Sequence, residues 1–224
     1  MLHLDYASEP DKVWLTNQET LRKLVGILGV LLPPLLYLSV RLLTDYTAPL
    51  ESISHYYYTR YGSILVIVVS LLAIFLLIYK GRKLADFILS SVAGFGALAL
   101  LLLPTSNISG PGKHVAVTHL LDNELRINIH FTSAGLFLLC LAIMSIFLFP
   151  RADKKVTEMK KVRNKFYVGL GVLMVSAMLV IVPGIYIIPE QYYNDHHLTF
   201  WMETLAVEFF GISWLIKGGV FLKD

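Results

Sequence analysis

The sequence predicts an all-α, polytopic membrane protein: a bundle of six transmembrane helices with both termini in the cytoplasm. Its composition favours this fold, because 56% of the 224 residues are hydrophobic and only 16% are charged. A soluble domain usually carries about a quarter charged residues, so the shortfall indicates lipid as the surrounding solvent. The chain also contains long apolar runs that are continuous rather than alternating, which is typical of spanning helices and not of barrel strands.

Six apolar runs are each close to the roughly 20 residues that cross a hydrocarbon core. We expect residues 1–224 to form a single transmembrane domain, because too few polar residues remain outside the runs to build a soluble one. Residues 1–23 should form a cytoplasmic N-terminal segment and the start of the first helix. The predicted spans are residues 24–43, 61–79, 84–103, 127–149, 166–188 and 198–216.

Two of these helices contain residues that disturb helical hydrogen bonding. Pro33 and Pro34 lie in the middle of the first span and should kink it, and the Pro183-Gly184 pair should act in the same way in the fifth. The single cysteine, Cys140, lies within the fourth apolar run, so it has no partner for a disulfide within the chain and is expected to serve packing.

The distribution of Lys and Arg predicts the orientation. Fifteen of the 19 such residues lie in the N-terminal segment, the second and fourth connections and the C-terminal segment. The other four are Arg41, Arg60, Lys113 and Arg126. Since positive charge concentrates on the cytoplasmic side, both termini are expected there.

The histidines are distributed unevenly under this topology. Only His3 would be cytoplasmic; His55, His114, His119, His130, His196 and His197 would lie on or near the outer face. An interfacial belt of amphipathic side chains explains the neighbouring tyrosines better than it explains the histidines. The outer half of the bundle is therefore where we expect chemistry.

Helical spacing gathers polar residues into stripes. Steps of three and four residues align His130 and Ser133 in the fourth span, and His197, Trp201 and Glu208 at and within the last. If these stripes and that of the second span face one another, they line a polar cavity open to the outer side. The expected binding residues are Arg126, Tyr56, Thr59, Ser63, Ser133, Trp201, Glu203 and Thr204.

Glu208 carries the most weight among these residues, because it lies near the middle of the last span. An ionisable side chain at that depth costs at least about 2.5–3.5 kcal/mol and marks a functional candidate. The alternative is a neutral Glu that joins two helices through a hydrogen bond. Both roles remain open at the level of sequence.

The histidines are also candidates for a zinc site, which needs three or four N, O or S ligands. His55, His130 and His197, with His196 adjacent, could supply the ligands, while Glu208 or Asp195 handles protons. The sequence contains no compact motif such as H-E-x-x-H. A second set of candidates pairs Ser54 as a nucleophile with a nearby base, although Ser52 and Ser54 could equally cap a helix.

The segment Ser52-Ile53-Ser54-His55-Tyr56-Tyr57-Tyr58-Thr59-Arg60 resembles the S-I-S-x-Y-Y-x-T signature of an uncharacterised family of small bacterial six-helix membrane proteins. The segments Trp201–Glu203 and Phe210–Gly218 resemble the last helix of that family. The resemblance covers roughly residues 21–218. It implies the six-helix fold and a place in the bacterial cytoplasmic (inner) membrane, and no activity.

Serine near the second helix and histidines at the outer ends of later helices also resemble, more remotely, the superfamily of alkaline ceramidases and adiponectin receptors. That resemblance implies an intramembrane zinc hydrolase acting on lipid amides. The chain departs from that pattern in having six spans rather than seven and adjacent His196-His197 rather than an H-x-x-x-H pair. Asp86, the only acid of the third helix, lies at the cytoplasmic end, far from the histidines.

Three classes of function remain open from the sequence. The first is a protein that binds a lipid or other amphiphile in its cavity, with a zinc-dependent lipid hydrolase as the enzymatic version. The second is a proton- or ion-coupled transporter or channel that uses Glu208 and Glu203. The third is a membrane scaffold without chemistry. The expected partners are membrane lipids and a lipid or amphiphile substrate, and not nucleic acid.

Overall fold

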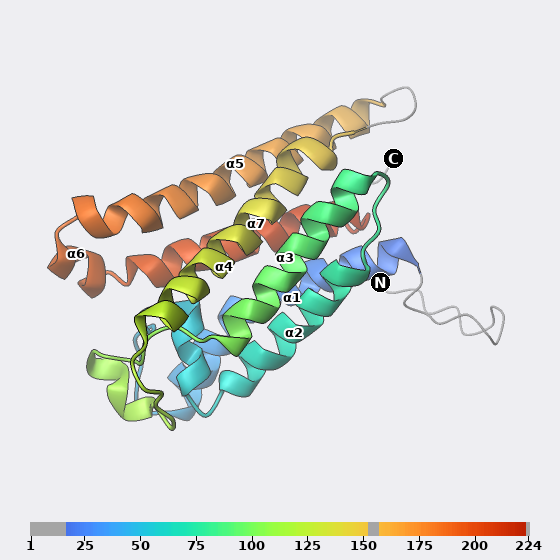
Figure 1. Ribbon diagram of the computed structural model, residues 1–224. Helices are drawn as coiled ribbons and strands as arrows, with labels where there is room; N and C mark the ends of the chain where they lie inside the picture. Colours follow the sequence, from blue (N-terminus) through green and yellow to red (C-terminus); the bar gives the residue numbers. More distant parts are fainter. Residues whose placement is uncertain (1–16, 152–156, 223–224) are drawn as a thin grey trace, which may run out of the picture.

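The structure, a computed structural model, describes residues 17–151 and 157–222. In these ranges the chain is helical, with one isolated β-bridge between Thr59 and Ala116 and no strand (Figure 1). The elements are α1 (Gln18–Leu43), η2 (Ile53–Tyr58), α2 (Gly62–Ile78), α3 (Leu84–Leu102), η3 (Pro111–Val115), α4 (Glu124–Ile143), the π-helical η4 (Met144–Leu148), α5 (Glu158–Ile187), α6 (Glu190–Asp195) and α7 (Leu198–Lys217).

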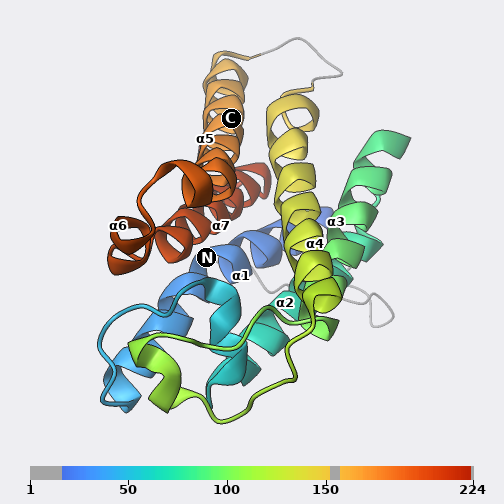
Figure 2. The same cartoon turned by 60° about the vertical axis from the view of Figure 1, so that its left-hand side comes forward.

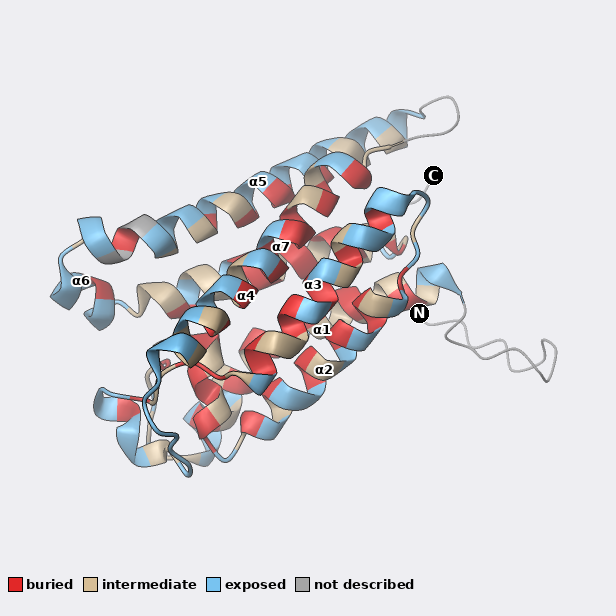
Figure 3. Cartoon of the chain, viewed as in Figure 1, coloured by how far each residue is buried: buried red, intermediate tan, exposed pale blue. Residues whose placement is uncertain are grey.

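Four helices are long and apolar enough to cross a membrane: α1, α3, α4 together with η4, and α5 from Glu158 to Val182. Exposed positions run along the outer faces of these helices (Figure 3). They include large apolar side chains such as Leu31, Phe95 and Leu179. Such surfaces are unfavourable in water and suit a hydrocarbon solvent. The prediction of an all-helical, membrane-embedded protein is confirmed to this extent.

A helix occupies each of the six predicted ranges. Helix α2 is apolar but has only 17 residues, and α7 is not among the four long apolar helices. Helix α1 continues through Pro33 and Pro34, and α5 continues past Gly184 to Ile187, so the prolines interrupt neither helix.

The two ends of the bundle differ (Figures 1 and 2). The start of α1, the connection between α2 and α3 and the end of α7 lie together at what we call the terminal end. Residues 44–61 and 103–123 cover the opposite end, the loop end, and α6 lies there too. Within the loop end, the Tyr58 hydroxyl donates to the carbonyl of Thr105, and Val117 N donates to Tyr58 O at 2.9 Å.

Small residues set the closest helix contact, between α1 and α7. A Cβ added at Gly26 would lie 2.8 Å from Gly211 O, and one added at Gly211 would lie 2.7 Å from Val30 N. Side chains are absent at these positions, so the two backbones approach closely, which is how helices in membranes gain van der Waals contact. Helix α7 is therefore fixed in the middle of the bundle, against α1 on one side and α5 on the other.

Helix α5 meets α4 most closely at the terminal end. A Cβ added at Gly171 would lie 2.5 Å from Ile146 in η4 and 3.1 Å from Ala142 O. Next to this contact, the Ser145 hydroxyl lies 2.6 Å from Ser213 Oγ and 2.8 Å from Tyr167 O, which ties α4, α5 and α7 together. Toward the loop end, the axes of α4 and α5 diverge (Figures 1 and 2).

Gly211→Val should destabilise the bundle, because the new side chain would meet the α1 backbone and the helices would have to separate. Overpacking of this kind costs about 1–3 kcal/mol. The midpoint of thermal unfolding in detergent should fall relative to the wild type. Gly169→Val is the matched control, since a Cβ there meets nothing within 4 Å. Equal effects of the two changes would show that α1 and α7 do not pack as described.

Candidate functional site

A cavity of about 870 Å³ lies at the loop end of the bundle. Its walls come from α4, α5, the corner between α6 and α7, and the two covering segments near residues 46–55 and 108–112. The cavity exists because α4 and α5 are joined near η4 and diverge from there. It lies between elements that are distant in sequence, so no single sequence motif predicts it.

Apolar side chains form the wall on the side of α4 and α5. Ala134 and Leu138 of α4 face Met178 and Ile181 of α5 across the space. At its margin lie Phe131, which is 56% exposed, and Val182, which is 64% exposed. Because exposed apolar residues flank this margin, the cavity opens toward the surface that suits hydrocarbon.

Polar side chains concentrate on the opposite wall. Glu51, Ser52 and His55 come from the covering segment around η2, and Glu203 comes from α7. His197 joins α6 to α7 with a left-handed backbone (φ 48°), which is uncommon for a residue other than glycine and is often found at functional sites. The cavity thus has a polar wall and an apolar wall, the arrangement of a site for an amphiphile.

His55 is the centre of a hydrogen-bonded chain. Its Nε2 lies 2.8 Å from Glu51 Oε2, and its Nδ1 lies 2.7 Å from Ser52 Oγ. A carboxylate only accepts, so Nε2 carries the proton and donates to Glu51. In the neutral ring Nδ1 is then an acceptor, and the Ser52 hydroxyl donates to it. The order carboxylate, imidazole, hydroxyl is that of a nucleophile activated by a base that a third group orients.

Glu51 is held as a carboxylate. Its second oxygen accepts from Ser109 N at 2.8 Å, Ser109 Oγ at 2.6 Å and Gly110 N at 3.0 Å. Burial raises the pKa of Glu51, but the hydrogen bonds from His55, Ser109 and Gly110, together with electrostatic attraction to the His55 ring, outweigh it and lower this pKa to about 2. The residue therefore stays ionised and links the two covering segments.

Glu203 holds the same segment from the other side. Its Oε2 accepts a hydrogen bond from Ile53 N at 2.7 Å, at the first residue of η2. A helix N-terminus has N–H groups without partners inside the helix, and Glu203 Oε2 satisfies one of them. Through this bond α7 fixes where η2 begins, and with it the position of Ser52 and His55.

The cavity lining contains acidic side chains but no Lys or Arg among the described residues. Among the described residues that line the cavity there are three carboxylic side chains, Glu51, Asp195 and Glu203, and neither Lys nor Arg. Burial lowers the pKa of His197 below its usual range, so this ring is neutral at pH 7. The site therefore favours a neutral or positively charged group over an anion.

The structure does not bring the predicted zinc ligands together. Within residues 17–151 and 157–222, no three His, Cys, Asp or Glu side chains form a group that could hold a metal ion. His130 is buried elsewhere, where its Nδ1 lies 3.1 Å from Leu100 O and 3.0 Å from Leu103 O. Its Nε2 lies 3.0 Å from Ser54 Oγ. His130 thus satisfies carbonyls at the end of α3, which otherwise lack helical partners.

Ser54 therefore bonds to His130 and not to His55, and it does not line the cavity. His196 is also outside, exposed and stacked on Tyr192 with ring centroids 3.9 Å apart. Of the four histidines expected to bind metal, only His55 and His197 reach the cavity. Asp195, expected to handle protons, lines it as well.

The three polar stripes do not face one another. Residues 53–58 form a separate 3₁₀ helix, so Tyr56 and Thr59 precede α2 and are buried, whereas Ser63 is exposed. The stripe on α4 packs against α3, with Ser133 O 3.0 Å from a Cβ added at Gly96. The inner part of the α7 stripe packs against α1. Helical periodicity correctly placed these residues on one face of α4, but it could not predict which helix that face packs against.

The remaining predicted residues lie outside the cavity too. Arg126 donates to Thr105 O at 3.5 Å, and Trp201 is 44% exposed beside Tyr37. Thr204 is half-buried in α7. Glu208 is half-buried there as well, with no hydrogen bond or ion pair to another described side chain. Glu203, one turn closer to the loop end, is the glutamate of α7 that reaches the site.

Glu51 and Ser52 are the functional candidates that the sequence did not single out. A signal was present, because Glu51 and His55 stand four residues apart, the spacing that pairs side chains on a helical turn. Only the fold shows that Ser52, rather than Ser54, is the serine that His55 contacts.

The stability of the loop end should depend on pH through the ionisation of Glu51. A carboxyl with a lowered folded-state pKa stabilises the fold above its ordinary pKa of 4.5 and loses this contribution as pH falls toward about 2. Discounted for partial exposure, the effect is about 1–2 kcal/mol. Thermal unfolding between pH 5 and pH 2 should show a loss of stability that is much smaller in Glu51→Gln. Identical profiles would contradict the bonding described for Glu51.

Comparison of the chain with protein-family models, with curated proteins and with solved structures gave no match. The two resemblances drawn from the sequence therefore stay predictions.

Proposed function

We propose that this protein binds a neutral or cationic amphiphile in the cavity between α4, α5 and α7. One observation carries the proposal: a single cavity that joins a wall of carboxylates and histidines to an apolar wall opening toward the membrane surface. The polar group of the ligand would contact Glu51, Ser52 and His55. Its hydrocarbon part would lie along α4 and α5.

The size of the cavity supports a small amphiphile. A volume of about 870 Å³ falls in the range of about 300–1,000 Å³ that is common for ligand sites. Such a space can enclose a headgroup and part of one chain, and the open margin at Phe131 and Val182 lets the rest of a chain extend into lipid.

The charge of the lining supports the choice of headgroup. With three carboxylic side chains and no Lys or Arg among the described lining residues, an anionic headgroup would meet repulsion in a medium that screens charge poorly. An amine, amide or hydroxyl group can instead donate hydrogen bonds to these acceptors.

We further propose that six helices, α1 to α5 and α7, span the membrane, with both termini in the cytoplasm of a bacterium and the cavity in the outer half. The excess of Lys and Arg in the segments at the terminal end supports this orientation. A transporter using Glu208 has less support, since that carboxyl lies outside the cavity lining. No structural observation favours a scaffold.

Filling the cavity should block binding. Gly135 lines the cavity and a Cβ added there meets nothing within 4 Å, so Gly135→Trp should place its ring in the space without moving the backbone. A fluorescent long-chain alkylamine should bind the wild type in detergent, and its affinity should fall at least about tenfold in Gly135→Trp.

The control for this experiment is Gly169→Trp, an equally unobstructed site on the exposed face of α5. A long-chain carboxylic acid with the same fluorophore should bind more weakly than the amine. Equal binding of the amine to the wild type and to both variants would mean that the cavity does not take it up.

A second candidate function is hydrolysis of an acyl ester or amide of such an amphiphile. The chain Glu51–His55–Ser52, which opens onto the cavity, favours it. In this reaction the Ser52 oxygen attacks the carbonyl carbon as its proton moves to His55 Nδ1. That proton then goes to the leaving group, and water releases the acyl group by the same route. The charge of Glu51 stabilises the protonated ring.

A fluorophosphonate probe should label the wild type at Ser52. Ser52→Ala should abolish the labelling and His55→Ala should slow it by about 10²-fold or more, since the base is lost. Ser63→Ala is the matched control, because this serine is exposed on α2 and does not line the cavity. Absence of labelling in the wild type would exclude this hydrolase and leave amphiphile binding to be judged by the alkylamine.

A further inference from the structure

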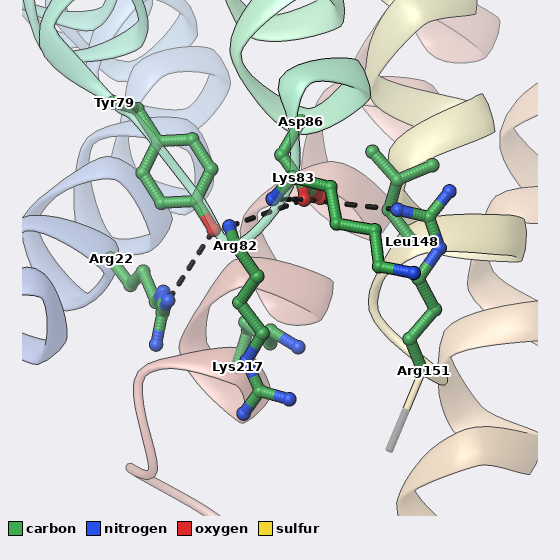
Figure 4. Close-up of a pocket in the computed structure, with 8 residues that line it drawn as sticks. All are labelled: Arg22, Tyr79, Arg82, Lys83, Asp86, Leu148, Arg151 and Lys217. Atoms are coloured by element: carbon green, nitrogen blue, oxygen red, sulfur yellow. Dashed lines mark hydrogen bonds and ion pairs between the residues drawn. The ribbon is translucent and has the colours of Figure 1, made fainter. Parts of the chain in front are cut away.

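A second, smaller pocket lies at the terminal end of the bundle, far from the amphiphile cavity. Its volume is about 190 Å³, and it is lined by Tyr79, Leu148, Asp86 and five basic residues (Figure 4). The basic residues come from four places in the chain: Arg22 in α1, Arg82 and Lys83 before α3, Arg151 after η4, and Lys217 at the end of α7.

This concentration of charge exceeds what a positive-inside bias requires. Topogenic Lys and Arg usually extend into water, whereas Arg22, Arg151 and Lys217 are all half-buried. Figure 4 shows Arg22 and Tyr79 on one side of the pocket and Lys83 and Arg151 on the other, with Arg82 and Lys217 between them. Like charges held so close repel one another unless an anion lies between them.

Asp86 does not supply that anion by itself. Its Oδ2 accepts from Lys83 N at 2.8 Å and from Arg82 N at 3.2 Å, so it is used to hold the turn before α3. The nearest Arg151 nitrogen lies 3.8 Å from it, beyond hydrogen-bond distance. One carboxylate thus faces five basic side chains in the pocket lining. Burial and the charges of Lys160, Arg22 and Arg82 lower the pKa of one of them, Lys217, to about 7.

Two donor atoms of the residues that line the pocket also lack acceptors. Arg22 Nε and Arg151 Nη1 are buried and have no hydrogen-bond partner within the described parts of the chain. A buried donor left unpaired is costly, and each such group in a native protein calls for a specific partner. Both belong to guanidinium groups, which bind phosphate and carboxylate oxygens in a fixed geometry.

Two of the basic side chains, those of Arg22 and Lys217, are held in place before any ligand arrives. Arg22 donates to Gln18 Oε1 at 2.9 Å and lies over the ring of Tyr79, 5.6 Å from its centroid. Lys217 donates to Phe149 O at 3.0 Å and lies 5.0 Å from the centroid of the Phe149 ring. Because these side chains are already ordered, little conformational entropy is lost when an anion binds.

We propose that this pocket binds a phosphate group. The volume fits one phosphate and not a whole lipid, and the five basic side chains supply donors from several directions. The group could belong to the headgroup of an anionic phospholipid or to a soluble phosphate, and both present the same oxygens. The site does not depend on the amphiphile proposal, since it lies at the other end of the bundle and prefers the opposite charge.

Purified full-length protein can be tested with two probes. Native mass spectrometry would compare retention of phosphatidylglycerol with phosphatidylcholine, and thermal unfolding would be measured with and without inorganic phosphate. The variants are Arg22→Gln and Arg151→Gln. Lys165→Gln is the matched control, because it removes one exposed positive charge from the same end outside the pocket.

We expect phosphatidylglycerol or inorganic phosphate to bind the wild type and the control equally, and each pocket variant about tenfold more weakly. Retention of the lipid alone would assign a headgroup site, and stabilisation by phosphate alone would assign a soluble ligand. In phosphatidylcholine without phosphate, the variants should be no less stable than the wild type, which shows that they fold. The proposal fails if neither probe binds, or if Lys165→Gln weakens binding as much as the pocket variants.

Discussion

The site depends on how the backbone of residues 44–61 is satisfied at the end of the bundle. Irregular backbone near a membrane needs hydrogen-bond partners supplied by protein. Here Glu203 Oε2 accepts a hydrogen bond from Ile53 N, and His130 bonds to Ser54, so two helices hold η2 from two directions. Glu51 then bonds across to Ser109 and Gly110. The polar wall of the cavity is a product of these bonds.

The helices were predictable from sequence, because hydropathy reports directly on the solvent that surrounds a segment. The faces by which the helices pack against one another were not predictable. Lipid-facing and buried side chains are both apolar in a membrane protein, and helical periodicity alone cannot distinguish them. Ser63 illustrates the limit: it was expected to line the cavity together with Thr59, yet the break between η2 and α2 leaves it exposed. The close contact between Gly26 and Gly211 could not be predicted from the sequence either.

The candidate site was predicted in part. Histidines and glutamates were expected at the outer end, and His55, His197, Asp195 and Glu203 do line the cavity. The pairing of His55 with Ser52 could not be predicted, because it depends on a short 3₁₀ helix whose start is set by a residue 150 positions away. His130 was assigned to a ligand set because a histidine that satisfies carbonyls has no sequence signature distinct from one that binds metal.

The two pockets give the bundle opposite chemical preferences at its two ends, and the amphiphile cavity adds a constraint of its own. Its margin at Phe131 and Val182 lies on the apolar outer surface, between helices that are joined only toward the terminal end. An amphiphile of the kind we propose would enter there by lateral diffusion within the bilayer. Occupancy would then follow the mole fraction of the amphiphile in the membrane, so dilution of the aqueous phase would leave it unchanged while added bystander lipid would lower it.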